Sequence, residues 1–269
     1  MFSNIIIFIL GSMIGSFLNV CIYRLPLGQS IVKPRSHCPQ CKKTIPWYDN
    51  VPLVSYFVLR GRCRLCGQRF SFRYFLVEAI TASMFLIFYI RHGLSFDFIF
   101  YTLFVCALII AAFVDIAHRI IPDEVSMGGI VIGFILNSLR GLDVSPLGFN
   151  YSPLLDSLFG IVIGAGVIYL TGKCFDLVYF KLLKKGPIDG ETQSMGIGDV
   201  KLLAMIGAFL GYRLALLTFF VAPIFGVIVG LVNLAVRKQH VIPYGPFLSL
   251  AAVINLFWAH TILRLIFFR

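Results

Sequence analysis

Four cysteines form two CxxC pairs in a polar stretch of this 269-residue chain. Cys38 pairs with Cys41 and Cys63 with Cys66, and 21 residues separate the two pairs. This spacing is typical of zinc ribbons, in which four thiolates from two turns converge on one ion. A site closed by four thiolates leaves no position for water, so the zinc would be structural. The alternative is that the cysteines form two disulfides or redox-active pairs. Stable disulfides are disfavoured if this stretch faces the reducing cytosol, as its basic residues predict.

Three aspartates lie in or at the ends of apolar stretches, where an acid is a functional candidate because charge is costly in a bilayer. Asp115 ends a long apolar run, Asp123 follows eight residues later, and Asp199 ends the sequence GIGD. Two carboxylates held close together share one proton, so one can activate water while its protonated partner polarises a peptide carbonyl. This pattern indicates aspartyl peptide hydrolysis, which needs neither a metal nor a nucleophilic side chain.

Each aspartate also has a structural explanation. Asp115 could pair at a membrane interface with His118 or Arg119. Asp123 follows Ile-Pro before an apolar run, a pattern typical of a helix start, and Asp199 could likewise cap a helix. Taken singly, the aspartates do not decide between these roles.

The composition predicts that the elements holding these residues lie in a membrane. Apolar residues make up 59% of the chain and charged residues 13%, and the mean hydropathy is +0.91. Too few polar side chains remain to cover a water-facing surface.

The first apolar run lacks a preceding basic region, so we interpret it as a retained transmembrane helix and not as a cleaved leader.

Eight apolar stretches are long enough to be read as membrane helices, with the sixth the shortest. They cover residues 4–22, 74–91, 97–116, 124–139, 154–172, 200–212, 214–236 and 245–267. The fold class is therefore all-α: a polytopic membrane protein of about eight transmembrane helices, with a small cytosolic zinc-ribbon-like domain between the first and second. We expect three parts, at 1–22, 23–73 and 74–269, of which the last holds the aspartates.

Glycines on two of these stretches are expected to let helices pack closely in lipid. Gly160, Gly164 and Gly166 fall on one stretch, and Gly226 and Gly230 fall on another at GxxxG spacing. This is a prediction about packing, and no chemistry is attached to these positions.

The distribution of basic residues predicts how the chain crosses the membrane. Ten lysines and arginines lie between residues 24 and 73, where Asp49 is the only acid, so this segment is expected in the cytosol. The connectors near 117–123, 173–199 and 237–244 would share that side, which places both chain ends outside. The formal charge of +11 is therefore expected to face anionic membrane lipid and not nucleic acid.

An ordered set of motifs runs along nearly the whole chain. It comprises GSFLNVCIYRLP at 15–26, the two CxxC pairs, RYFLVEAITA at 73–82, Asp-x7-Asp at 115–123, GxGD at 196–199 and PYGPFL at 243–248. The set resembles the bacterial type IV prepilin peptidases, which are intramembrane aspartyl proteases of the GxGD type. The resemblance implies a multi-pass protein of the bacterial inner membrane that cleaves type IV prepilins and type II secretion pseudopilins after a glycine, at the cytosolic face. The family's catalytic pair corresponds to Asp115 and Asp199, with Asp123 as supporting structure.

The four cysteines extend what the resemblance implies. Family members that keep them commonly also methylate the new N-terminal residue, usually phenylalanine, with S-adenosylmethionine. Because no Gly-rich fingerprint of soluble methyltransferases is present, we expect the cofactor site in the cytosolic segment, where Trp47, Tyr48, Asp49 and Asn50 are candidates. Three alternatives remain: a peptidase without methylation, an ion-coupled transporter with the two aspartates as proton carriers, and a non-catalytic zinc-ribbon scaffold.

Overall fold

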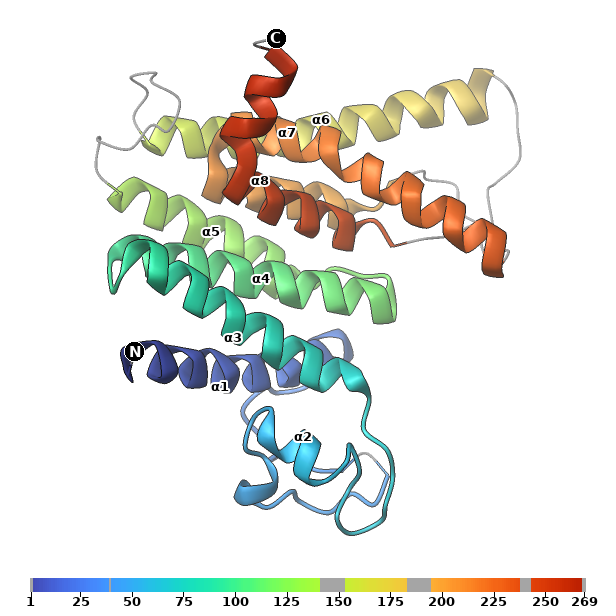
Figure 1. Cartoon of the computed structure of the whole chain (residues 1–269). Coiled ribbons are helices and arrows are strands. Elements are labelled where there is room, and N and C mark those ends of the chain that lie inside the picture. The colour runs from blue at the N-terminus through green and yellow to red at the C-terminus, as the bar shows by residue number, and fades with distance from the viewer. Residues whose placement is uncertain (1, 39, 141–152, 183–194, 238–242, 268–269) are drawn as a thin grey trace. The chain divides into compact units, whose positions relative to one another are not determined.

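The computed structural model is built from helices, turns and isolated bridges over the part of the chain that it describes (Figure 1). It describes residues 2–38, 40–140, 153–182, 195–237 and 243–267. The α-helices are α1 (Phe2–Arg24), α2 (Val54–Val58), α3 (Phe72–His92), α4 (Phe96–His118), α5 (Asp123–Leu139), α6 (Pro153–Asp176), α7 (Ile197–Arg237) and α8 (Gly245–Phe267). Short helical turns are η1 (Leu25–Leu27), η2 (Trp47–Asp49) and the π-helical η3 (Leu177–Leu182). The prediction of an all-α fold is confirmed, and the four cysteines lie in the segment 25–71 between α1 and α3, here called the cysteine segment.

All eight predicted apolar stretches are helical. Six of them each coincide with one helix, and the stretches 200–212 and 214–236 both fall in α7, which Gly211 interrupts with φ 79° and ψ 172°. Within the described residues, α1, α3, α4, α6 and α7 are long and apolar enough to cross a bilayer. The 17-residue α5 and the apolar part of α8 fall short of that length.

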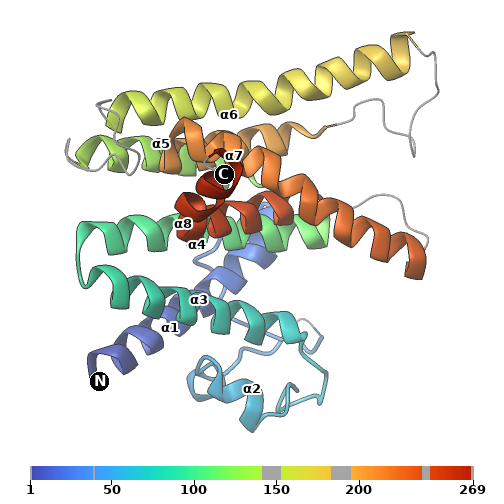
Figure 2. The same ribbon diagram turned by 45° about the horizontal axis from the view of Figure 1, so that its top comes forward.

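The chain folds into two compact units, an N-terminal unit (Met1–Ile110) and a C-terminal unit (Ala111–Arg269). In the N-terminal unit α1 lies along α3 (Figures 1 and 2). A Cβ atom at Gly11 would lie 2.8 Å from the Cα of Ala82, and one at Gly15 would lie 2.7 Å from the Cα of Glu78. Only glycine permits such an approach, so this GxxxG pair sets the α1–α3 packing. Sequence reasoning missed it.

In the C-terminal unit α7 packs against α5, α6 and α8, as Figures 1 and 2 show. Gly160 and Gly164 of α6 face the backbones of Gly207 and Leu203, respectively, at distances that leave no room for a Cβ atom. The packing prediction is therefore confirmed for these two glycines.

The packing prediction is wrong for two other glycines. A Cβ atom at Gly166 would meet no described atom within 4 Å, and one at Gly226 would make only an ordinary contact with Phe247 at 3.7 Å. Neither position lies against the backbone of another described helix.

The interruption of α7 at Gly211 leaves backbone groups without their usual helical partners. In a regular helix the Tyr212 N–H would donate to the Ala208 carbonyl. Here the Tyr212 N–H donates to the carboxylate of Asp156 on α6. A side chain at Gly211 would collide with that carboxylate, and the backbone there has a positive φ. Glycine is therefore required at this position for two reasons.

The freed carbonyl of Ala208 is satisfied by side chains of neighbouring helices. Ser157 Oγ of α6 donates to it at 2.8 Å, and Asn137 Nδ2 of α5 donates at 3.3 Å. Both side chains are buried. In lipid a broken helix is tolerated only when such groups find internal partners, so these hydrogen bonds stabilise the break.

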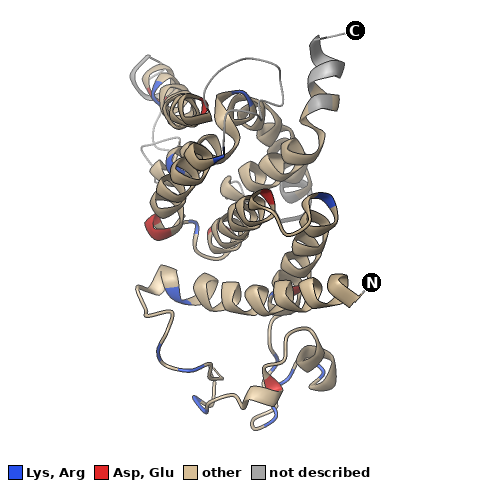
Figure 3. Ribbon diagram, turned by 90° about the vertical axis from the view of Figure 1, so that its left-hand side faces the viewer, with Lys and Arg blue, Asp and Glu red and all other residues tan. Residues whose placement is uncertain are grey.

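Charged residues are sparse on the described helices and frequent in the cysteine segment. Figure 3 shows long tan helices and blue Lys and Arg positions gathered along the loops between α1 and α3. This distribution agrees with the predicted basic segment. Parts of the connectors 173–199 and 237–244, with their cations Lys184, Lys185 and Lys238, lie outside the described residues.

Candidate functional site

The four cysteines of the two CxxC pairs meet at one point. The Sγ atoms of Cys38, Cys41, Cys63 and Cys66 all lie within 4.8 Å of one another, and those of Cys38 and Cys66 are 3.8 Å apart. Four sulfurs placed tetrahedrally at about 2.3 Å from zinc would be separated by about 3.8 Å. The cysteines are free thiols in the structure, and their arrangement fits a closed four-thiolate metal site better than two disulfides.

The two CxxC turns share one backbone design. In the first, the N–H of Cys38 donates to the Lys43 carbonyl and the N–H of Lys42 donates to the Cys38 carbonyl. In the second, the N–H of Cys63 donates to the carbonyl of Gln68 and that of Gly67 donates to the Cys63 carbonyl.

The residue after each second cysteine has a positive φ, 57° at Lys42 and 70° at Gly67. Each turn is closed by one bridge, which joins His37 to Thr44 and Arg62 to Arg69. The repeated turn explains how two short sequence motifs bring four thiols together.

Backbone amides also prepare one thiol for metal binding. The amides of Cys66 and Leu65 donate hydrogen bonds to the sulfur of Cys63, which lowers the pKa of the Cys63 thiol to about 7. At Cys63 this environment favours the thiolate, which is the form that binds metal, whereas the pKa of the neighbouring Cys66 thiol is raised to about 11.

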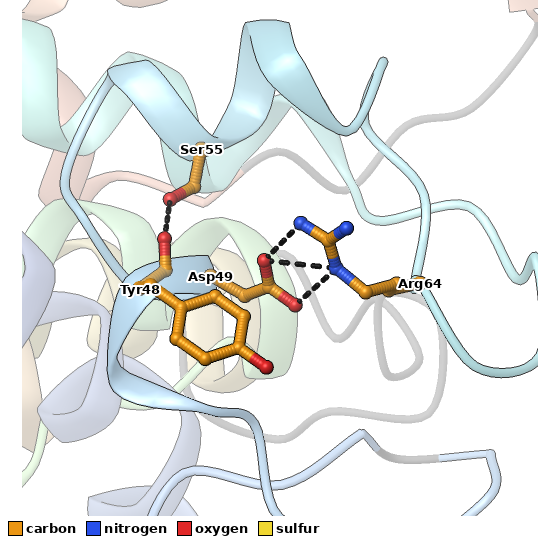
Figure 4. A network of polar contacts seen from close by, with 4 residues as sticks. All are labelled: Tyr48, Asp49, Ser55 and Arg64. Carbon is orange, nitrogen blue, oxygen red and sulfur yellow. Dashed lines mark hydrogen bonds and ion pairs between the residues drawn. The ribbon is translucent and has the colours of Figure 1, made fainter.

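An ion pair between the buried Asp49 and the exposed Arg64 joins η2 to the second CxxC turn. The guanidinium of Arg64 donates to both carboxylate oxygens of Asp49, from Nη2 to Oδ1 at 2.6 Å and from Nε to Oδ2 at 2.8 Å (Figure 4). The hydrogen bonds from Arg64 hold the pKa of the Asp49 carboxyl below its usual range. Such two-point pairing fixes orientation as well as charge, so Asp49 anchors the η2 turn to the cysteine turn.

The four residues predicted near a cofactor site separate into two groups. Asp49 and Asn50 line a cavity inside the N-terminal unit, described below. Trp47 and Tyr48 are exposed, and their rings contact each other edge to face. The Arg64 guanidinium lies over the Tyr48 ring, 5.8 Å from its centre. Asp49 therefore has a structural partner, and the aromatic pair lies at the surface of the unit.

The first candidate catalytic aspartate is buried near the C-terminal end of α4. Asp115 is 6% exposed, and its Oδ2 accepts a hydrogen bond of 2.9 Å from the backbone N–H of Gly245. A Cβ atom at Gly245 would lie 2.8 Å from the same oxygen. Within the described residues the hydrogen-bond partner of Asp115 is thus this amide, and both His118 and Arg119 are exposed. No ion pair of Asp115 with either side chain is found among the described residues, although the charge of Arg119 still acts on the carboxylate.

The second candidate, Asp199, lies in the first turn of α7 and is half-buried. Its charge lies close enough to Asp115 for the two to interact electrostatically. Ile121 links the two positions, because it lies against both Gly198 and Gly245, 3.3 Å from an ideal Cβ atom at either glycine. In the C-terminal unit, the C-terminal end of α4 and the N-terminal ends of α7 and α8 therefore lie close together near Ile121.

Asp123 is held by a residue that sequence reasoning did not single out. Its Oδ1 accepts from Lys201 Nζ at 2.7 Å, and Lys201 follows Asp199 by two residues. Asp123 begins α5, as the sequence predicted, but the ion pair also ties that helix start to the start of α7. The sequence feature that could have predicted this ion pair is the lysine two residues after the GxGD motif.

Fold and site together define an all-α membrane protein with a four-cysteine site in one unit and an aspartate pair in the other. Comparison with family models gives the class. Residues 9–92 match the bacterial peptidase A24 N-terminal domain, and residues 102–231 match the type IV leader peptidase family.

Curated relatives agree over most of the chain. It is 32% identical to the prepilin leader peptidase/N-methyltransferase of Pseudomonas putida, over 94% of this chain and 90% of the relative. The protein of the same name from Legionella pneumophila is 30% identical, over 98% of this chain and 94% of that relative. The Myxococcus xanthus protein of that name is 36% identical over 86% of this chain, but the match spans only 63% of that relative. No solved structure matches the chain. The chain belongs to the type IV leader peptidase family, as its ordered motifs predicted.

Proposed function

We propose that this protein removes the leader peptide of type IV prepilins and related pseudopilins, with Asp115 and Asp199 as an aspartyl dyad. The observation that carries the proposal is the buried Asp115 carboxylate, oriented by the Gly245 amide and close to the charge of Asp199. The family membership and the names of the relatives support the same activity.

The chemistry follows from two carboxylates that share one proton. The ionised acid takes a proton from water, whose oxygen attacks the scissile carbonyl. The protonated acid donates a hydrogen bond to that carbonyl and stabilises the negative charge that develops on it. As the tetrahedral intermediate collapses, a proton passes to the leaving amine and the acids exchange roles. The Gly245 amide holds one oxygen of Asp115 in place, which leaves the other for water or for the partner acid.

We further propose that the N-terminal unit carries an N-methyltransferase activity that uses S-adenosylmethionine. The names of the relatives support this activity. When bound, the cofactor supplies a sulfonium methyl group, which is transferred to the lone pair of the new N-terminal amine as the C–S bond breaks. The four converging thiols fit zinc, which would hold the two CxxC turns together without taking part in either reaction.

The setting of both activities is proposed from charge. With the basic cysteine segment on the cytosolic side, both activities would act at the cytosolic face of the bacterial inner membrane, and the N-terminus would lie outside. The substrate's hydrophobic helix would then dock in the lipid, and the glycine that precedes it would reach the dyad.

The test is mass spectrometry of a purified prepilin incubated with the solubilised enzyme and S-adenosylmethionine. Wild type should release the leader and add one methyl group to the mature chain. Asp115→Asn and Asp199→Asn should leave the prepilin intact while remaining inserted. Glu124→Gln is the matched control: it removes an exposed acid from α5 without changing the dyad, and it should cleave as wild type does.

Three results would change the proposal. Cleavage that survives both aspartate substitutions would refute the aspartyl mechanism. Cleavage without methylation would leave a plain peptidase and reopen the role of the cysteine segment. Proton-coupled uptake into vesicles that both substitutions abolish, without any cleavage, would favour the transporter alternative.

A further inference from the structure

A cavity of about 460 Å³ lies inside the N-terminal unit, between α1, the beginning of α3 and the cysteine segment. This volume is in the range of small-molecule sites, about 300–1,000 Å³. Three tyrosines, Tyr23, Tyr56 and Tyr74, lie in its lining together with the acids Asp49 and Glu78. Leader cleavage by the dyad uses none of these residues.

Asn19 of α1 contributes a buried acceptor to this lining. The side chain is 3% exposed, and its Nδ2 donates to the Tyr74 carbonyl at 2.9 Å. That hydrogen bond fixes the amide orientation, so Oδ1 is directed away from Tyr74. The Oδ1 atom is buried and has no partner among the described residues. A buried acceptor without a donor is unfavourable, and a ligand N–H would satisfy it.

Glu78 of α3 supplies a carboxylate that no cation neutralises among the described residues. Its Oε2 accepts a hydrogen bond of 2.8 Å from the Leu53 N–H. Leu53 has a φ of 62°, a left-handed conformation that is strained for leucine. Strained residues of this kind persist where the surrounding structure holds them in place, and they cluster at ligand and active sites. Asp49, the other acid in the lining, is already paired with Arg64.

The arginine in the lining does not neutralise Glu78 either. Arg24 is buried, and its two terminal nitrogens donate to the carbonyls of Ser30 and Pro34 at 2.9 and 2.6 Å. It therefore stabilises the first turn of the cysteine segment. The cavity thus combines an unpaired acceptor, an unneutralised carboxylate and aromatic walls, a combination that favours a cationic ligand.

We propose that this cavity binds a primary ammonium group, with the Glu78 carboxylate and Asn19 Oδ1 as its acceptors. The inference rests on the proposed methyl transfer, which involves two such amines. One belongs to the methionine part of S-adenosylmethionine, and the other is the new N-terminus of the cleaved pilin. Asn19 and Glu78 lie within the GSFLNVCIYRLP and RYFLVEAITA motifs, to which the peptidase mechanism assigns no role.

The experiment measures binding to the purified full-length protein in detergent. The probes are S-adenosylmethionine, S-adenosylhomocysteine and phenylalaninamide, the last as a mimic of the pilin N-terminus. Glu78→Gln keeps the size of the side chain and an acceptor for the Leu53 N–H, but it removes the charge. Asn19→Leu removes the buried acceptor. Glu124→Gln, an isosteric loss of an exposed acid on α5, is the matched control. Metal content and the elution profile on gel filtration report whether each variant is folded.

Loss of a charged hydrogen bond predicts an increase of about 10- to 100-fold in the dissociation constant of the Glu78→Gln variant. Weaker binding of both adenosyl compounds would identify the cofactor's ammonium as the ligand. Weaker binding of phenylalaninamide alone would identify the N-terminal amine. Binding of all three probes at the control level by a folded, metal-containing Glu78→Gln variant would overturn the inference. The proposed methyl transfer is tested separately, because a wild type that adds no methyl group refutes that function even if phenylalaninamide binds through Glu78.

Discussion

The two candidate sites are built in opposite ways. The cysteine site takes its four ligands from two short turns of one backbone design, so each half of the site is specified within a few residues. The aspartate site takes its groups from the ends of three helices, and Gly245 is 130 residues from the Asp115 that it contacts. A local site can form with little surrounding structure, whereas a dispersed site depends on how its helices pack.

This difference predicts that the two sites respond differently to damage. Removal of a thiol should abolish the cysteine site and disturb the cysteine segment around it, because that segment has little hydrophobic core of its own. Small changes in helix packing should affect the aspartate site even when both carboxylates are present.

The largest effect is expected when one aspartate of the dyad is neutralised. Asp115→Asn or Asp199→Asn should slow leader cleavage by roughly 10³-fold or more, because general acid–base catalysis is lost. Methylation of a synthetic, already cleaved pilin peptide should continue in both variants. Parallel mass spectrometry of the two reactions checks this separation, and a joint loss of both activities would show that the sites are not independent.

Loss of a thiol is the converse experiment. Cys63→Ser should release the metal and lower methyl transfer by at least about tenfold, while prepilin cleavage persists. Metal analysis by mass spectrometry, with both activities assayed on the same sample, gives the readout. Cys174→Ser, at an exposed cysteine of α6, is the matched control and should keep its metal. Full metal content in Cys63→Ser would contradict the four-thiolate site.

A single methyl group at Gly245 should damage the aspartate site from the backbone side. Because its Cβ atom would lie 2.8 Å from Asp115 Oδ2, Gly245→Ala must displace the carboxylate. A shift of this size is expected to lower the cleavage rate by about 10²-fold. Gly128→Ala is the control, since a Cβ atom there would meet nothing within 4 Å. Equal rates for the two variants would show that the Gly245 contact does not position the dyad.

The smallest effect is expected at the ion pair between Asp123 and Lys201. The Asp123 side chain is 65% exposed, so the pair is expected to contribute only about 0.2–1 kcal/mol. Asp123→Asn should therefore lower cleavage by about two- to fivefold. A double-mutant cycle with Lys201→Met isolates the interaction, because the second substitution should add little after the first. Fully additive losses would show that the ion pair does not align α5 with α7.

The contrast also explains which features could be predicted from the sequence. The CxxC turns were recognisable because their geometry depends on adjacent residues, and the eight apolar stretches because lipid imposes a length and a composition. The two aspartates stood out because acids are rare in such stretches.

Other features depend on tertiary packing and could not be read along the chain. The N–H donor at Gly245 is a backbone group that every non-proline residue carries. The residue type at position 245 therefore does not reveal that this group orients Asp115. The unpaired Asn19 Oδ1 is recognisable only from the structure, in which Nδ2 of the same amide donates to the Tyr74 carbonyl. Likewise, the requirement for glycine at Gly211 follows from the Asp156 carboxylate, which is distant in sequence.

The hydrogen bond from the Gly245 amide to Asp115 bears on how this site can vary during evolution. A coded substitution at position 245 can crowd the carboxylate, but only proline deletes the donor itself. Sequence drift therefore has few ways to remove this orienting group and many ways to obstruct it. An ester in place of the amide, introduced with an α-hydroxy acid at position 245, would remove the donor alone and measure what the main chain contributes to catalysis.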